Sequence, residues 1–422
     1  MPVSADFKER IFPHIRKISN HYQTPFHLYD EQGILDTGKR LKEAFKGVEV
    51  FREYYAVKAL PNPSILKVMQ KMDFGFDCSS IAELDLSRQI GATGDDIMFT
   101  SNNTGPEEFD AAAADGGCIL NLDDISLIGK VPEMPETICF RYNPGERRAG
   151  NDIIGTPVES KYGVSHEQIT DAYRQAMERG AKKFGLHTML ASNELNYSYM
   201  VQTAQMLLGL VEDISKELNI SFEFINIGGG LGIPYRPEQD ELDLESMGAE
   251  ISQLFVDFKK KNGYMPGLFM ESGRYITGPH GVLVTTVINH KKIYRDYVGV
   301  DACMSALMRP GMYDAYHHID VLDKDNTETR VVDVAGSLCE NNDKFAVQRE
   351  LPICDEGDLI IIHDTGAHGH AMGFNYNGKV RPKELLFTDA GKVKMIRREE
   401  TLEDLFATLN FDQDNLKIFG SL

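Results

Sequence analysis

Short apolar segments alternate with stretches of helical period along the first two thirds of the chain. The segments are rich in aliphatic and aromatic residues, which favours strands, and the residues after each segment repeat apolar positions with a helical period. We predict eight strands, at residues 54–59, 74–78, 97–100, 118–122, 137–142, 183–189, 222–227 and 268–271. Eight strand–helix units in about 230 residues are typical of a (β/α)8 barrel.

The predicted helices carry their own start signals. Asn62 with Pro63 opens the first helix, Ser80 caps the second, and Gly105 precedes the third. The helix after the sixth strand has the clearest apolar face, formed by Met200, Ala204, Leu207, Leu208, Val211, Ile214 and Leu218. A doubly wound open sheet is the competing architecture, but the sequence lacks the GxGxxG turn expected after its first strand.

From residue 281 the pattern changes to β-rich segments with almost no helical period. We expect strands at 281–293, 297–300, 330–334, 358–362 and 384–387, and a short amphipathic helix at 401–409. This pattern favours a mostly antiparallel β-barrel or sandwich domain. The predicted domains are the barrel at 46–280 and the β domain at 281–422, with residues 1–45, which include a strand at 25–30, contributing to the β domain.

Composition excludes several classes of function. A net charge of -20 argues against nucleic acid or an anionic membrane as the main partner, because both attract clustered lysine and arginine. The sequence has no signal-peptide pattern and no run of 18 apolar residues, so we expect a cytoplasmic protein without a membrane segment. Its 6 cysteines lack a CxxC pair and a histidine partner at zinc spacing, so we expect free thiols and no metal site.

Lys58 is the first candidate for chemistry, because it lies near the end of the apolar run 54–60. Ammonium groups are rarely buried unless they are paired or used chemically, and a desolvated lysine is a nucleophile that can form a Schiff base with an aldehyde. A lysine that simply emerges where a strand meets its loop is the alternative interpretation.

Two further candidates follow the last two predicted strands, at the face of a barrel where active sites are built. Strand seven runs into the glycine-rich loop 228–232, whose backbone N–H groups are free to hold a phosphate; a tight turn without a ligand is the alternative. Strand eight ends at Glu271, close to Arg274, where an exposed ion pair is the alternative. A lysine, a phosphate cradle and a carboxylate are together what pyridoxal phosphate requires, so we predict this cofactor.

Seven motifs in order resemble those of the barrel-type, fold type III, pyridoxal-phosphate amino acid decarboxylases. They are YYAVKAL, FDCSSIAEL, NIGGGLG, ESGR, MRPGMYDAYH, LCENND and NYN, and the resemblance extends from about Pro25 to about Glu400. Within the family they are most similar to the branch acting on meso-diaminopimelate. The resemblance therefore implies decarboxylation of meso-2,6-diaminopimelate to L-lysine and CO2 in lysine biosynthesis, by a homodimer whose active sites lie between subunits.

The resemblance also implies roles for single residues. Lys58 would be the Schiff-base lysine and Cys339 the residue that crosses from the partner subunit to return a proton. The implied cofactor contacts are Ser192, Gly229, Gly230, Glu271, Gly273, Arg274 and Tyr376. The implied substrate contacts are Arg274, Arg309 and Tyr313 for a distal carboxylate, Glu340 for a distal ammonium, and Tyr376.

The chain departs from the family pattern at four places. Met189 stands where the family has a histidine that packs on the cofactor ring, and Ser272 replaces a proline. His368 stands where a tyrosine is expected, and Asn341–Asn342 replace a serine–glycine pair. These departures concern the substrate more than the cofactor.

Other functions are also compatible with these motifs. A related decarboxylase acting on ornithine, lysine, carboxynorspermidine or a carrier-bound amino acid is the first alternative, and Arg309 with Tyr313 argues for a distal carboxylate instead. A racemase on a similar scaffold leaves LCENND and MRPGMYDAYH without a role. A regulator or inactive partner that binds pyridoxal phosphate is the alternative from another class, and the joint presence of Lys58, Cys339 and Glu340 argues against it.

Overall fold

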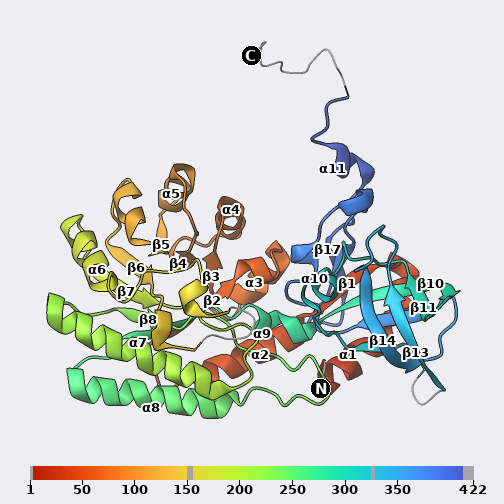
Figure 1. Cartoon of the computed structure of the whole chain (residues 1–422), viewed down its shortest axis with the longest axis horizontal. Helices are drawn as coiled ribbons and strands as arrows, with labels where there is room; N and C mark the ends of the chain where they lie inside the picture. The colour runs from red at the N-terminus through yellow and green to blue at the C-terminus, as the bar shows by residue number, and fades with distance from the viewer. Residues whose placement is uncertain (1–2, 150–154, 325–327, 412–422) are drawn as a thin grey trace.

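The computed structural model of the protein describes residues 3–149, 155–324 and 328–411. Its strands form two sheets, a closed barrel of parallel strands and a separate 9-stranded sheet. Figure 1 shows the barrel, surrounded by helices, on the left and the second sheet on the right. The predicted combination of a (β/α)8 barrel with a mostly antiparallel β domain is confirmed.

The barrel contains the predicted eight strands. They are β2 (Phe51–Ala56), β3 (Gly75–Cys78), β4 (Gly94–Phe99), β5 (Cys118–Leu122), β6 (Thr137–Arg141), β7 (Lys183–His187), β8 (Phe224–Asn226) and β9 (Gly267–Met270). The predicted end of the first strand is wrong, because β2 stops at Ala56 and residues Val57–Ala59 form a 3-10 turn. The predicted end of the sixth strand at Met189 is also wrong, since β7 ends at His187.

Helices cover the outside of the barrel. They are α3 (Pro63–Gln70), α4 (Ile81–Gln89), α5 (Pro106–Ala113), α6 (Ile169–Glu178), α7 (Tyr197–Leu218), α8 (Leu244–Asn262) and the short α9 (Arg274–Thr277), with a 3-10 turn at Ile125–Lys130 after β5. The predicted helix starts are confirmed: the Asn62 side chain accepts from the Ser64 N–H, and the Ser80 side chain accepts from the Glu83 N–H. The apolar face of α7 is buried in the barrel core from Met200 to Ile214.

The β domain contains more strands than the sequence pattern predicts. Its strands are β1 (Phe26–Asp30), β10 (Gly281–Lys292), β11 (Asp296–Val300), β12 (Ile319–Val321), β13 (Thr329–Ala335), β14 (Lys344–Pro352), β15 (Leu359–Ile362), β16 (Lys383–Phe387) and β17 (Val393–Arg397). The predictions missed β12, β14 and β17. Two short helices follow β10 in the chain, α10 (Arg309–Tyr313) and α11 (Leu402–Phe406), and α11 is shorter than the predicted 401–409.

Alternation along β10 separates two apolar cores. Val282 and Val284 face one cluster, whereas Leu283 faces the other, as expected where side chains point to opposite faces of a strand. The first cluster is covered by α1 (Ala5–Tyr22), which contributes Phe7 and Ile11 among its buried residues. The N-terminal helix therefore belongs to the packing of the β domain.

The rest of the N-terminal segment is divided between the two parts. β1 lies inside the 9-stranded sheet, antiparallel to β10 and parallel to β16. The following helix, α2 (Glu31–Ala44), places Ile34 and Leu41 in the barrel core instead. The chain thus passes from the sheet to the barrel at Asp30, and the domain boundaries at 45 and 280 stay predictions.

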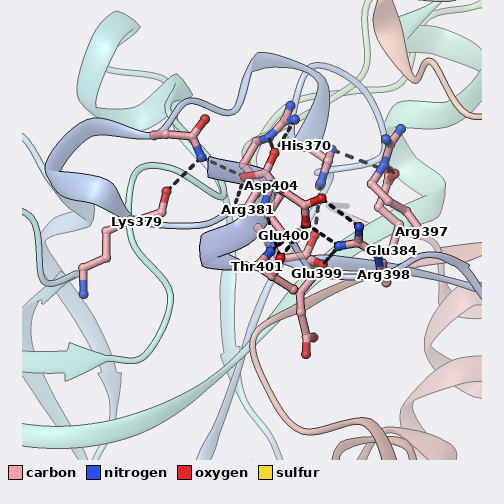
Figure 2. Close-up of polar contacts among 12 residues, drawn as sticks. His370, Lys379, Arg381, Glu384, Arg397, Arg398, Glu399, Glu400, Thr401 and Asp404 are labelled. Carbon is pink, nitrogen blue, oxygen red and sulfur yellow. Dashed lines mark hydrogen bonds and ion pairs between the residues drawn. The ribbon is translucent and has the colours of Figure 1, made fainter. Parts of the chain in front are cut away.

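Glu384 on β16 connects the two parts of the molecule. Its carboxylate accepts from the Tyr29 hydroxyl at 2.7 Å and from the Asn62 amide at 3.2 Å, four residues after Lys58. Figure 2 shows this carboxylate between Arg397 and His370. The loop after Lys58 is therefore tied to the β domain by a buried, fully paired charge.

Among the described residues, no helix is long and apolar enough to cross a membrane.

His27 on β1 predicts an acid-sensitive contribution to stability. Its Nε2 donates to the Ala306 carbonyl at 3.0 Å, and burial lowers its pKa from 6.5 to about 4. An unfolded chain takes up a proton near pH 6.5 and the folded chain only near 4, so the stabilisation is complete above 6.5 and is lost as the pH falls to about 4. This shift of the His27 pKa corresponds to about 3 kcal/mol of unfolding free energy.

We therefore expect the difference in unfolding free energy between wild type and His27→Gln, which cannot ionise, to narrow by about 3 kcal/mol from pH 7.5 to pH 4. Urea unfolding followed by circular dichroism at several pH values measures this difference. A difference that stays constant across this range would contradict the assignment.

Candidate active site

The inward-facing side chains of the barrel change from apolar to polar toward the carboxyl ends of its strands. Phe224 and Phe269 stack in the interior with ring centroids 4.2 Å apart. Two residues farther along the chain, and thus on the same face of each strand, are Asn226 and Glu271. The barrel therefore has an aromatic floor below a polar layer at the face where such barrels carry their active sites.

Glu271 is the central buried charge of this polar layer. Its Oε1 accepts from the Asn226 amide at 2.7 Å, and its Oε2 lies 3.2 Å from Nε2 of His187 at the end of β7. Burial by itself raises the pKa of Glu271, but His187, Lys58 and Asn226 outweigh burial and hold that pKa below its usual value. The carboxylate is therefore ionised, as a partner for a protonated ring nitrogen must be.

Lys58 lies in the 3-10 turn directly after β2, and its side chain is 55% exposed. Its Nζ is 3.7 Å from Oδ2 of Asp77 on β3. Burial by itself lowers the pKa of Lys58, but the carboxylates of Asp77, Glu271 and Glu83 raise it above its usual value. The lysine is thus an ammonium held among carboxylates, instead of the desolvated neutral amine that the apolar sequence run indicates.

The glycine-rich loop after β8 packs backbone against backbone. A Cβ on Gly229 would overlap the carbonyl oxygen of Glu271, and one on Gly230, whose φ is +94°, would overlap the carbonyl oxygen of Ala191. Only glycine satisfies both restrictions. The loop is therefore wedged between the segments that follow β7 and β9, and Ser192 lies beside it in the first of these.

Met189 lies against the same loop. The Gly229 N–H donates to its Sδ at 3.2 Å, so the thioether that replaces the expected histidine contacts the predicted phosphate cradle directly. On the other side, a Cβ on Gly273 would lie 2.7 Å from the Cβ of Ala59, next to Lys58. The absence of a side chain at Gly273 thus lets the segment after β9 approach the Lys58 turn.

Two arginines converge on one phenol at the side of the site that faces the β domain. Arg274 in α9 and Arg309 in α10 both donate to the Tyr235 hydroxyl, at 2.6 and 2.8 Å. Within the described residues, neither guanidinium has a carboxylate within 4.0 Å. Burial of Arg309, which is 7% exposed, lowers its pKa. Two adjacent cations with only neutral partners form a site for an anion.

His317 holds Arg309 in this position. Its Nδ1 donates to the His363 carbonyl at 2.7 Å, which leaves Nε2 as the acceptor for Arg309 at 3.0 Å. Burial, followed by the charge of Arg309, lowers the pKa of His317 well below its usual value, so the ring stays neutral. The tautomer of His317 therefore fixes the orientation of the guanidinium.

The remaining predicted residues lie on the surface of the β domain. Cys339 and Glu340 are exposed in the loop between β13 and β14, while Tyr313 and Tyr376 are 56% and 54% exposed. The Cys339 N–H donates to the Asn377 side chain at 2.7 Å, which joins the cysteine loop to the turn that carries Tyr376. Among the described residues, no hydrogen bond or ion pair connects this group with Lys58, so the single chain does not bring the two sets together.

The turn that carries Tyr376 is supported from the C-terminal side. The Glu400 carboxylate accepts from Asn375 at 2.7 Å and from Nε of Arg381 at 2.6 Å. Figure 2 shows Glu400 and Arg381 together in this network. The exposed Tyr376 is therefore carried on a firmly anchored backbone.

Sequence reasoning assigned no role to Asp77, His187, Asn226, Tyr235 or His317. The first three share one detectable signal, which is a polar residue at an inward position near the end of a barrel strand. Tyr235 and His317 lie in loops and carry no such signal.

Three histidines of the β domain, His363, His368 and His370, have different surroundings. His363 faces Asp320 with Nε2 3.0 Å from the carboxylate, and His370 donates to the Pro382 carbonyl at 3.1 Å, whereas His368 faces the active site. In the ranges that the structure covers, no three histidine, cysteine, aspartate or glutamate residues are grouped to hold a metal ion.

The groups at the barrel mouth fit pyridoxal phosphate. Gly229 and Gly230 form a backbone loop in which neither position can carry a Cβ, Glu271 is kept ionised, and Lys58 supplies the amine. Fold and site together define a pyridoxal-phosphate enzyme built on a (β/α)8 barrel.

The chain belongs to the pyridoxal-dependent decarboxylases, because residues 32–278 match the family described as "Pyridoxal-dependent decarboxylase, pyridoxal binding domain". It is 47% identical over 404 residues to "Protein TabA" of Pseudomonas amygdali pv. tabaci, covering 96% of this chain and 95% of that protein. It is 35% identical over 409 residues to diaminopimelate decarboxylase of Methanothermobacter thermautotrophicus, covering 95% of both. The protein is therefore a pyridoxal-phosphate-dependent carboxy-lyase.

Solved structures agree with this assignment. Diaminopimelate decarboxylase of M. jannaschii in complex with L-lysine superimposes with a TM-score of 0.87 at 30% identity, covering 95% of both chains. The enzyme of Helicobacter pylori, also with L-lysine, gives a TM-score of 0.84 at 28% identity, covering 93% of this chain and 98% of that one.

The packing of Gly230 yields a direct test of the cradle. We expect Gly230→Ala to destabilise the protein by about 2 kcal/mol or more and to weaken pyridoxal phosphate binding at least about tenfold, because the new Cβ is strained and displaces the segment after β7. Thermal melting and fluorescence titration with the cofactor measure both effects.

Gly209→Ala is the matched control. Outside the backbone of α7 itself, no atom lies within 4 Å of a Cβ at this exposed position, so we expect unchanged cofactor binding and a stabilisation of up to about 1 kcal/mol. Equal cofactor affinity in both variants would show that the Gly230 backbone is not part of the cradle.

Proposed function

We propose that the protein decarboxylates meso-2,6-diaminopimelate to L-lysine and CO2 in lysine biosynthesis. The observation that carries this proposal is the pair Arg274 and Arg309 on the Tyr235 hydroxyl, without a carboxylate partner among the described residues. A substrate with a second carboxylate supplies the missing anion, and two arginine forks suit a planar carboxylate. The diaminopimelate decarboxylases among the relatives support this choice.

The same pair argues against substrates that end in a simple amine. Ornithine and lysine would place an ammonium beside two guanidiniums, one of which is buried. Bringing like charges together in a poorly solvated site is unfavourable, so such a substrate would bind weakly. Charge complementarity at this end of the site therefore selects a dicarboxylate.

The chain's own residues then have distinct tasks. Pyridoxal phosphate supplies a ring that accepts the electrons left when CO2 departs. Glu271 would supply the negative charge for the ring nitrogen, and the backbone of Gly229 and Gly230, with Ser192 and Tyr376, would hold the phosphate. Lys58 would supply the amine that binds the cofactor's aldehyde, and its Nζ lies 3.7 Å from Oδ2 of Asp77.

We propose further that two copies of the chain complete each other's active sites. Cys339, Glu340 and Tyr313 are exposed on the β domain and lack a contact with Lys58 within the described chain. In a homodimer, Cys339 of the partner returns a proton to the substrate carbon, and Glu340 meets the distal ammonium. Exposed functional residues far from their reaction centre are the support for this arrangement.

A second candidate is a decarboxylase of the same class with another diamino acid as substrate. A relative at 47% identity has a name other than diaminopimelate decarboxylase. Met189, Ser272, His368 and Asn341–Asn342 also depart from the family motifs. The arginine pair restricts this candidate to substrates that keep a distal carboxylate.

Release of CO2 tests the proposed reaction. With added pyridoxal phosphate, we expect the purified protein to release CO2 from meso-diaminopimelate at least about a hundredfold faster than from L-lysine or ornithine, and Lys58→Ala to abolish release. Release only from a different dicarboxylic diamino acid would establish the second candidate. Release of CO2 from none of these would contradict the proposed substrate.

Mixing two inactive variants tests the shared site. We expect co-expressed Lys58→Ala and Cys339→Ala to recover about a quarter of wild-type activity, because half of the dimers are mixed and each of these has one intact site. Each variant alone should stay inactive. Activity that does not recover on mixing would place Lys58 and Cys339 in separate, unshared sites.

A further inference from the structure

Tyr235 is held in place by the loop that carries the predicted phosphate cradle, between β8 and α8. The Gly232 N–H donates to the Glu194 carbonyl at 2.9 Å, and the Ile233 N–H donates to the Asn193 side chain at 3.0 Å. The side chain of Tyr235 is buried, with only 7% of the residue exposed. The backbone leading into this tyrosine is therefore anchored on the segment that follows β7.

Three side chains fix the orientation of the Tyr235 ring. The Cζ atoms of Arg309 and Arg274 lie 4.7 and 5.7 Å from its ring centroid. The ring of His317 packs edge-on against it, with ring centroids 5.2 Å apart and an angle of 73° between the planes. The phenol is thus presented to both guanidiniums from a packed position.

The hydroxyl of Tyr235 accepts two hydrogen bonds, and its own proton has no acceptor among the described residues. Its oxygen accepts from Nη1 of Arg274 at 2.6 Å and from Nη1 of Arg309 at 2.8 Å. A guanidinium has donors and no acceptor, so neither contact can use the hydroxyl proton. This proton is therefore left for a ligand at the two arginines.

Other buried tyrosines of the chain use the corresponding proton within the protein. The hydroxyl of Tyr29 donates to the Glu384 carboxylate at 2.7 Å, and that of Tyr173 donates to the Gly185 carbonyl at 2.6 Å. Because a buried donor without an acceptor is costly, the unused donor of Tyr235 points to a ligand that supplies the acceptor.

The three donors suit a carboxylate and disfavour an amine. A carboxylate has two oxygens with about four lone-pair sites, so it can accept from Arg274, Arg309 and the Tyr235 hydroxyl at the same time. An ammonium offers only donors, and it would meet two like charges and a phenol oxygen that is already engaged. The hydroxyl therefore adds to the selection that the arginines exert.

We propose that Tyr235 is a specificity residue whose hydroxyl donates to the distal carboxylate of the substrate, beside Arg274 and Arg309. This inference rests on the proposed function and deepens it, because recognition of the carboxylate then depends on a residue outside the seven sequence motifs. The phenol has two tasks: its oxygen holds the two guanidiniums, and its proton binds the anion.

Binding of two amines to the protein loaded with pyridoxal phosphate tests this contact without requiring turnover. L-lysine and 1,5-diaminopentane can both bring an amine to the cofactor, and they differ only in the carboxylate at the far end. Titrations followed by the absorbance of the bound cofactor give a Kd for each. The proteins are the wild type, Tyr235→Phe, which keeps the ring, and Tyr173→Phe, a control that removes a buried hydroxyl from α6.

We expect Tyr235→Phe to weaken the binding of L-lysine by about 10- to 100-fold and that of 1,5-diaminopentane by less than about threefold, because only L-lysine loses a hydrogen bond to its charged group. Tyr173→Phe should change neither Kd by more than about twofold, because its hydroxyl donates to a backbone carbonyl and not to the anion site.

A graded change of the phenol separates donation to the ligand from a role in holding the arginines. A 3-fluorotyrosine at position 235 has a more acidic phenol, so its protonated form is a stronger donor and a weaker acceptor. We expect it to bind L-lysine about two- to threefold more tightly than the wild type does. Unchanged or weaker binding would show that the hydroxyl acts only as an acceptor for the guanidiniums.

The outcomes separate this inference from the function on which it rests. If the wild type prefers L-lysine and Tyr235→Phe keeps that preference, the role of the hydroxyl is overturned and the proposed function stands. Equal losses for both ligands would assign Tyr235 to packing alone. If the wild type binds L-lysine no more tightly than 1,5-diaminopentane, the distal carboxylate site itself is overturned, and the inference and the proposed function fall together.

Discussion

The ionised state of the buried Glu271 is the condition on which the site depends. A carboxylate that is only 8% exposed stays charged here because His187, Asn226 and Lys58 supply donors and positive charge. These three residues follow or end three different strands, β7, β8 and β2. Closure of the barrel pairs β2 with β9 and so brings these three strand ends around one carboxylate, which gives the fold and the electrostatics of the site the same cause.

The second constraint is the close approach of backbones around that carboxylate. Gly229 contacts the carbonyl of Glu271, Gly230 contacts Ala191, and Gly273 contacts Ala59 beside Lys58. Each glycine removes a side chain at a place where two loops meet, so the phosphate cradle, the carboxylate and the lysine are held to one another by main-chain packing. Such packing is stiff, which is what pre-organisation of a cofactor site requires.

The β domain extends this arrangement to the far end of the substrate. It contributes Arg309 and His317 to the anion site and His368 to the Lys58 turn, and Glu384 ties it to the loop after Lys58. The site is thus built from both parts of the molecule. Substrate selection depends on how the β domain is docked, whereas the cofactor groups are supplied by the barrel.

Parts of the structure could be predicted because their signals are local. Barrel strands that are buried on both faces are apolar runs, and Asn62 and Ser80 carry helix-start signals within a few residues. In the missed strands β14 and β17, charged and polar residues interrupt the apolar ones, so neither strand shows a continuous apolar run. The end of β2 at Ala56 was mispredicted because the run stays apolar while the backbone turns to meet His368.

The sequence by itself determined the strand–helix rhythm, the eightfold repeat and the candidates Lys58, Gly229, Gly230 and Glu271, because each depends on side-chain pattern or on position after a strand. Only the tertiary structure decided the protonation of Lys58, the pairing of Arg274 with Arg309 on Tyr235, and the placement of His368. These features depend on charges and contacts between residues far apart in the chain, and such distances are set by the packing of the two domains.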